Sequence, residues 1–105
     1  MEDKNNLSYC TVSTENLPEE TETNEKVDIF KAMADPTRLK ILYLLEGNKL
    51  CACQIVNALD KPQPTISHHL SILIKANLVK WEKTGKWKYF QLNNNDLIKI
   101  IEQIN

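Results

Sequence analysis

Two thiols one residue apart, Cys51 and Cys53, are the side chains of this sequence best suited to chemistry. Cysteine thiolates are soft ligands, so such a pair can hold a soft metal ion. A third thiol, Cys10, stands near the beginning of the chain. An odd number of cysteines fits no simple intrachain disulfide framework, so ligand and redox roles both stay open.

A helix with a polar outer face is predicted after the thiol pair, over residues 63–76. Pro64 suits its first turn, because an N–H at that place has no partner within the helix. A shorter helix over residues 52–59 precedes it, with a tight turn at residues 60–63. Two helices joined in this way form a helix-turn-helix pattern. The apolar stripe of the second helix consists of Ile66, Leu70, Leu73 and Ile74.

Two further helices precede this pair and must position it. The first is predicted from about residue 24 to residue 34, with Asn24 as its N-cap. The second has a strong start signal, because Asp35 suits an N-cap and Pro36 suits the first helical position. Arg38 is expected on the more solvated side of this second helix.

After residue 77 the side-chain pattern changes from a helical period to alternation at every second residue, which is typical of β-strands. Residues 79–82 and 87–92 are rich in aromatic and β-forming side chains and predict two strands, with Gly85 in the turn between them. A last helix, over residues 95–104, carries more isoleucine than one small core needs, which favours a dimer interface. The predicted fold class is therefore mostly α with a β-hairpin, a homodimeric winged helix-turn-helix.

Length and composition indicate one small domain. The chain has 105 residues, 42% of them hydrophobic, so a partner subunit would help its stability. No apolar run approaches the roughly 20 residues that a membrane span requires. The first residues lack the features of a secretory signal, so a cytoplasmic protein is expected. Residues 1–23 are polar and acidic and predict a flexible tail, which leaves residues 24–105 as the folded domain.

The overall charge of −1 hides a strong asymmetry. Residues 1–28 hold eight acids and two bases, a net charge of −6, whereas residues 29–105 carry a net charge of +5. Six lysines and a single acid, Glu82, lie between Lys61 and Lys88. Clustered positive charge is typical of a phosphate-binding surface, although an ordinary solvated face gives the same pattern.

Four motifs in order carry a family resemblance: KAMADPTRLKIL at residues 31–42, LCAC at 50–53, QPTISHHL at 63–70 and GKWKYFQL at 85–92. Over about residues 24–105 the chain resembles the ArsR/SmtB family of metal-responsive transcriptional repressors. The resemblance implies a homodimer packed through its first and last helices. It also implies a protein that occupies an operator in double-stranded DNA and leaves it when metal binds.

The helix geometry indicates which residues face DNA. The polar side of the predicted recognition helix enters the major groove through its N-terminal end, where an amide can read adenine. Charge and the resemblance together place wing lysines against phosphate or the minor groove. His69 falls beside the apolar stripe, so we expect it half-buried and bonded to a backbone carbonyl. The predicted DNA-binding residues are Gln63, Thr65, Ser67, His68, Ser71, Lys83 and Lys86.

The two thiols do not converge if both lie in a regular helix. At 100° per residue Cys51 and Cys53 point about 200° apart, with Cβ atoms roughly 7 Å apart. Two sulfurs that share one metal need a separation of about 3.5 to 4 Å. Chelation is therefore expected to unwind or reorient the helix start and to shift the recognition helix, so that the ligand favours a shape unable to bind DNA.

By resemblance, a Cys-x-Cys at this helix looks like a site for arsenite, antimonite, cadmium or lead. Arsenic-responsive relatives often carry a third cysteine where this chain has Val56. Cadmium- and lead-responsive relatives bring N-terminal cysteines across the dimer, and Cys10 is the one candidate here. Three thiols suit a trivalent metalloid best, so Cys51, Cys53 and Cys10 are the expected ligands of As(III) or Sb(III), with Cd(II) or Pb(II) as the alternative. The family's other site needs histidines on the last helix, and residues 93–105 contain none.

Other classes of function fit the sequence less well. A thiol redox switch fits cysteines without histidines, but no cation nearer than Lys49 is available to lower a thiol pKa. An enzyme is not expected, because Gly47 and Gly85 are the only glycines and an oxyanion-forming loop is lacking. A structural zinc site made of the cysteines and histidines would take its histidine ligands from the predicted recognition helix, which would then not be available to DNA. A winged helix used only for protein contacts would not need the lysine-rich wing.

Overall fold

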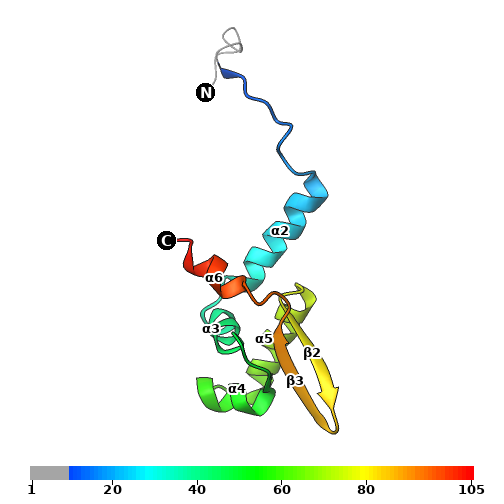
Figure 1. Cartoon of the computed structure of the whole chain (residues 1–105), viewed down its shortest axis with the longest axis vertical. Coiled ribbons are helices and arrows are strands. Elements are labelled where there is room, and N and C mark those ends of the chain that lie inside the picture. Colours follow the sequence, from blue (N-terminus) through cyan, green and yellow to red (C-terminus); the bar gives the residue numbers. More distant parts are fainter. Residues whose placement is uncertain (1–9) are drawn as a thin grey trace.

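The computed structural model describes residues 10–105. Figure 1 shows one long helix leading into a body of shorter helices and a β-hairpin that projects from it. Helices α4 (Ala52–Leu59) and α5 (Gln63–Lys75) with the following hairpin form a winged helix-turn-helix, which confirms the predicted mostly α fold with a β-hairpin. The elements are α2 (Glu20–Met33), α3 (Pro36–Leu44), β1 (Leu50–Cys51), α4 (Ala52–Leu59), α5 (Gln63–Lys75), β2 (Val79–Thr84), β3 (Trp87–Leu92) and α6 (Leu97–Glu102).

One apolar core joins all of these helices to the hairpin. In α5 the predicted stripe faces inward, since Ile66, Leu70 and Leu73 are buried while Ile74 is only partly buried. The core side chains come from α2, α3, α4, α5, both hairpin strands and α6. Each helix therefore holds the recognition helix in place through shared burial. No helix within residues 10–105 has the length and apolar character to cross a lipid bilayer.

The first helix begins one turn earlier than predicted. Its N-cap is Glu19, so the prediction of Asn24 as N-cap is wrong. Residues 20–28 are all exposed, so this part of the helix has no buried side that a periodic apolar pattern could reveal. Acidic residues in the first turn favour a helix start through the helix dipole. The predicted boundary between residues 23 and 24 falls inside α2, and the part of the predicted tail in residues 1–9 lies outside the described residues.

The second helix starts as the sequence predicts. Asp35 is the N-cap, its Oδ2 accepts a hydrogen bond of 3.0 Å from the backbone N–H of Arg38, and Pro36 occupies the first position. The pKa of the Asp35 carboxyl is lowered, mainly by that backbone N–H. This cap stabilises the start of α3 directly after α2 ends.

A short strand, β1, was not predicted. It pairs antiparallel with β3, Leu50 opposite Phe90 and Cys51 opposite Tyr89, to give a sheet of order β1-β3-β2. The sequence pattern placed the two thiols, Cys51 and Cys53, at the start of a helix, and that placement is wrong for Cys51, which lies in β1. Strand pairing with β3 is a contact between segments far apart in the chain, so local periodicity does not reveal it.

Candidate functional site

The Cys51 and Cys53 sulfurs face each other at 2.6 Å. Cys51 is the N-cap of α4 and has an extended backbone, with φ −81° and ψ 163°, whereas Cys53 is the second residue of the helix. The expected separation of about 7 Å assumed that both residues were helical. That expectation is wrong, and so is the need to unwind the helix before both thiols reach one ion.

Hydrogen bonds at the start of α4 shift the pKa values of the two thiols in opposite directions. The pKa of the Cys51 thiol is lowered, first by the hydrogen bond from Cys53 and then by backbone N–H groups that include that of Gln54. The pKa of the Cys53 thiol is raised, because it donates that hydrogen bond and then because of desolvation. The Gln54 side chain accepts from the Cys51 N–H at 2.9 Å and completes the helix cap. Cys51 is therefore the thiol that ionises first.

A groove of about 410 Å³ joins the thiol pair to both elements of the predicted DNA-binding surface. Its walls include Gln63 and Ser67 from the N-terminal half of α5, and Trp87 and Lys88 from β3. The Trp87 side chain is about half exposed, at 51%. Anything bound to the two sulfurs thus lies against the recognition helix and the wing.

Sequence reasoning missed the contribution of β3 to this groove. Trp87 and Lys88 were assigned only to a wing strand, and nothing in the local pattern indicated that this strand pairs with the segment that carries Cys51. The pairing of Cys51 with Tyr89 brings them together. Lys88 is further held by a cation–π contact, its Nζ lying 4.0 Å from the centre of the Trp81 ring.

The structure does not bring the third thiol to the pair. Cys10 is exposed, and the segment that begins there runs away from the body in Figure 1. Within residues 10–105, no cluster of three or more His, Cys, Asp or Glu side chains is placed to hold a metal ion. Each subunit alone thus presents two sulfurs to an ion in this part of the chain.

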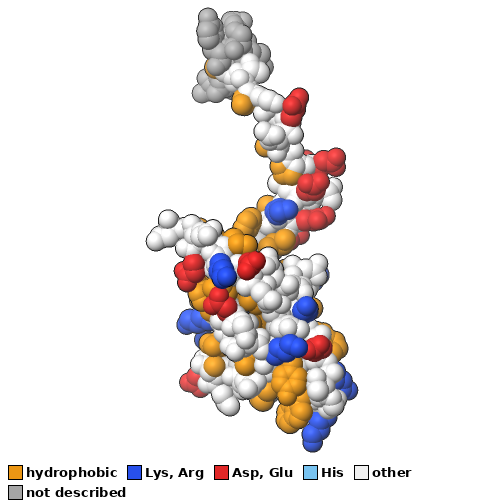
Figure 2. All heavy atoms as spheres, in the orientation of Figure 1, with side chains coloured by type: hydrophobic (Ala, Val, Ile, Leu, Met, Phe, Trp, Pro, Cys, Tyr) orange, Lys and Arg blue, Asp and Glu red, His pale blue; other side chains and the backbone are white. Residues whose placement is uncertain are grey.

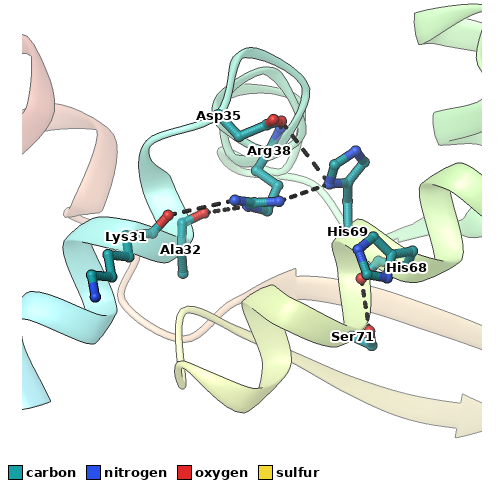
Figure 3. A network of polar contacts seen from close by, with 7 residues as sticks. All are labelled: Lys31, Ala32, Asp35, Arg38, His68, His69 and Ser71. Carbon is teal, nitrogen blue, oxygen red and sulfur yellow. Dashed lines mark hydrogen bonds and ion pairs between the residues drawn. The ribbon is translucent and has the colours of Figure 1, made fainter.

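The outer side of α5 has the exposure expected of a DNA-reading surface. Gln63, Ser67, His68 and Ser71 are exposed, while Thr65 is partly buried. The Ser71 hydroxyl donates to the His68 carbonyl at 2.7 Å (Figure 3), which leaves its oxygen free to accept only. These residues form a polar, compact face at the N-terminal end of the helix.

The hairpin carries the predicted basic wing. Lys83 and Lys86 are exposed, and Figure 2 shows basic side chains at the tip of the hairpin. Lys49, just before β1, forms an exposed ion pair of 2.7 Å with Glu82 of β2. Glu82, the single acid between Lys61 and Lys88, is therefore paired with a lysine from outside that segment.

His69 is half-buried as predicted, but its partner is not a backbone carbonyl. Its Nδ1 lies 3.0 Å from Nη1 of Arg38 (Figure 3). Arg38 was expected on the solvated side of its helix. That expectation is wrong, because the side chain turns back and its Nε donates to the Ala32 carbonyl at 2.6 Å.

Comparison with known proteins shows which family the chain is similar to. The model of bacterial regulatory proteins of the arsR family matches residues 35–80. An HTH-type transcriptional regulator of Methanocaldococcus jannaschii is 48% identical over 81 residues, which cover 73% of this chain and 91% of that protein. The arsenical resistance operon repressor of Bacillus subtilis is 37% identical, covering 70% of this chain and 71% of that one. A cadmium resistance regulatory protein CadC homologue of Staphylococcus aureus is 38% identical, covering 71% and 63%.

Solved structures show the same architecture. HlyU from Vibrio cholerae superposes with a TM-score of 0.73 at 27% identity, covering 82% of this chain and 97% of that chain. A winged helix-turn-helix domain from Mycobacterium bovis, at 22% identity, has a TM-score of 0.76 and covers 89% and 86%. The second likeness supports the fold alone.

Proposed function

Because the chain belongs to the ArsR family of bacterial transcriptional repressors, we propose that it is a homodimer that leaves its operator DNA when a thiophilic metal(loid) binds Cys51 and Cys53. As(III) and Sb(III) are the favoured effectors. One observation carries the proposal: the two facing sulfurs line the same groove as the N-terminal half of α5 and the wing strand β3.

DNA recognition is assigned to α5 and the hairpin. The exposed polar side chains at the start of α5 suit hydrogen bonds to base edges in the major groove, with Gln63 able to pair with adenine. Lys83 and Lys86 suit phosphate, which positions the protein on the duplex without reading sequence. Between them these two elements supply both kinds of contact that an operator complex needs.

The thiol pair fits a soft effector. The two sulfurs already face each other, so they need only move apart from 2.6 Å to the roughly 3.5 to 4 Å of two ligands that share one ion. The lowered pKa of Cys51 favours its thiolate, and Cys53 would give up its proton to the medium when the soft ion binds. A trivalent metalloid needs one more ligand, and Cys10 of the partner subunit is the proposed source. The names of the Bacillus subtilis and Staphylococcus aureus relatives, arsenical and cadmium resistance regulators, support effectors of this kind, with Cd(II) or Pb(II) as the alternative.

The groove provides the coupling between effector and DNA. An ion held by Cys51 and Cys53 lies beside Gln63 and Trp87, so its binding changes the space between α5 and β3 directly. The effector releases DNA to the extent that it binds the DNA-free shape more tightly than the DNA-bound shape. This route replaces the unwinding of α4 that the sequence had suggested.

Dimerisation is assigned to α2 and to α6 with the residues that directly follow it, which carry large apolar side chains that this chain alone leaves exposed. The exposed fractions are 41% for Val27, 59% for Phe30, 50% for Ile100 and 69% for Ile104. Figure 2 shows hydrophobic side chains along α2 where it leaves the body. Burial of such a surface against a second copy would stabilise a two-fold dimer.

A thiol redox switch is the second candidate, favoured by the lowered pKa of Cys51. The expected obstacle, the lack of a nearby cation, is removed because Cys53 and the helix N–H groups stabilise the thiolate. Peroxide would oxidise the Cys51 thiolate to a sulfenic acid. The Cys53 thiol would then displace water from it and form a disulfide.

The test is a titration of the reduced protein on its own promoter fragment with arsenite, cadmium, lead and hydrogen peroxide in separate runs. Anisotropy of labelled DNA reports release. In a Trp81→Phe background Trp87 is the only tryptophan, so its emission reports occupation of the groove. We expect release at about one arsenite per subunit, accompanied by a change in Trp87 emission.

Serine variants assign the ligands. Cys51→Ser and Cys53→Ser are expected to bind DNA like the wild type and to resist release by arsenite, while Cys10→Ser tests the third ligand. Release of either of the first two variants at wild-type arsenite concentrations would overturn the assignment of these thiols. Release by peroxide alone would favour the redox switch.

A further inference from the structure

One guanidinium, that of Arg38, joins three helices. Arg38 lies in the first turn of α3, its Nε donates to the Ala32 carbonyl in α2 at 2.6 Å, and its Nη2 lies 3.5 Å from the Lys31 carbonyl. Its Nη1 lies 3.0 Å from Nδ1 of His69 in α5. Figure 3 shows the side chain stretched between the end of α2 and the middle of α5.

At α2, the Arg38 guanidinium contacts backbone carbonyls at the C-terminal end of the helix. The last carbonyls of a helix have no partner within it, and a cation there also interacts favourably with the helix dipole. The Arg38 guanidinium meets both needs at Ala32, whereas the Lys31 carbonyl also accepts from the backbone N–H of Ala34 at 3.2 Å. Arg38 therefore has a contact with α2 that does not involve His69.

The α5 end of the contact fixes the protonation state of His69. A guanidinium can only donate, so Nδ1 of His69 must accept and the ring proton must be on Nε2. An imidazolium has no free acceptor and would lose this hydrogen bond. His69 is also directly next to His68, one of the residues assigned to DNA.

Direct packing between α2 and α5 is incomplete around this contact. A cavity of about 470 Å³ opens between them, lined by Asp28 and Ala32 of α2, Ile72 and Lys75 of α5, and Arg38 itself. Because side chains do not fill that space, the hydrogen bond through Arg38 constrains the angle between the two helices more than it would in a closed interface.

We propose that Arg38 and His69 form a positioning pair that sets recognition helix α5 relative to α2, and that tight operator binding requires His69 to be neutral. This inference rests on the proposed function, because it takes α5 as the DNA-reading helix and α2 as part of the dimer. The two recognition helices of a dimer must match successive major grooves, so a small rotation of α5 on α2 in each subunit lowers affinity.

The surroundings of His69 define the pH range in which the pair responds. The pKa of His69 is lowered by burial first, and the charges of Arg38, His68 and Lys61 lower it further, while Asp35, 4.0 Å away, raises it. The hydrogen bond is therefore intact above the ordinary histidine pKa of about 6.5 and is lost as pH falls through the lowered value in the folded protein.

The experiment compares two variants with the wild type on the promoter fragment, at fixed salt, from neutral to acidic pH. His69→Asn places an amide oxygen near the position of Nδ1 and does not titrate, so it keeps an acceptor for Arg38. His69→Leu removes the acceptor. We expect His69→Leu to bind about tenfold more weakly at neutral pH. His69→Asn should bind like the wild type there and lose less affinity in acid.

Two readouts separate positioning from folding and from the function itself. Circular dichroism should show all three proteins folded, and long-range ¹H–¹⁵N spectra should show the proton of His69 on Nε2. If folded His69→Leu binds as tightly as the wild type, or if His69→Asn and the wild type share one pH profile, the positioning role is wrong. If the wild type binds the fragment at no pH or salt concentration, the proposed function itself fails.

Discussion

Removal of the lysine at the tip of the wing gives a quantitative test of the DNA-binding surface. Lys86 is exposed in the turn between β2 and β3, and a homodimer presents it twice. Each phosphate contact releases about 0.9 counterion, so Lys86→Ala should reduce the slope of log K against log salt by about 1.8. At about 0.15 M salt this corresponds to roughly 30-fold weaker binding, if the contact contributes nothing at 1 M.

The assay is a salt series of anisotropy titrations with the promoter fragment and with an unrelated duplex. Because a phosphate contact carries no sequence information, the loss should be equal on both DNAs. Lys40→Ala is the matched control, since Lys40 is an exposed lysine on α3, away from the wing. An unchanged slope for Lys86→Ala, or an equal change for Lys40→Ala, would refute the placement of the wing on phosphate.

Asp35→Ala should lower the free energy of unfolding by about 1 kcal/mol in urea denaturation through loss of the helix cap. Because the Asp35 pKa is lowered, its contribution should be complete above pH 3.8 and lost as pH falls through its folded value. Ile100→Lys should shift the dimer toward monomer in sedimentation equilibrium, while Lys99→Ala on the same helix should not. Iodoacetamide should alkylate Cys51 before Cys53 at neutral pH, as peptide mass spectrometry would show, because thiolate formation is easier at Cys51.

The thiol site and the positioning pair are separate devices on the same recognition helix. The groove acts on its N-terminal half through Gln63 and Ser67, whereas Arg38 holds its middle through His69. Substitution at His69 should therefore change the affinity for DNA and leave the binding of arsenite to Cys51 and Cys53 unchanged.

The sequence by itself determined the elements whose signals are local. Asp35 and Pro36 identified the start of α3, and the spacing of Ile66, Leu70 and Leu73 identified the buried side of α5. These signals are local because caps and helical periodicity involve residues within a turn or two of one another. The same kind of signal was missing at the exposed beginning of α2, where the predicted N-cap was wrong.

Only the tertiary structure decided how the two thiols meet and what surrounds them. Pairing of β1 with β3 keeps Cys51 extended, outside the helix, so its sulfur reaches Cys53 and both line a groove with Trp87. The contact between Arg38 and His69 likewise joins residues 31 positions apart. Both arrangements depend on how distant segments pack, which local sequence patterns do not encode.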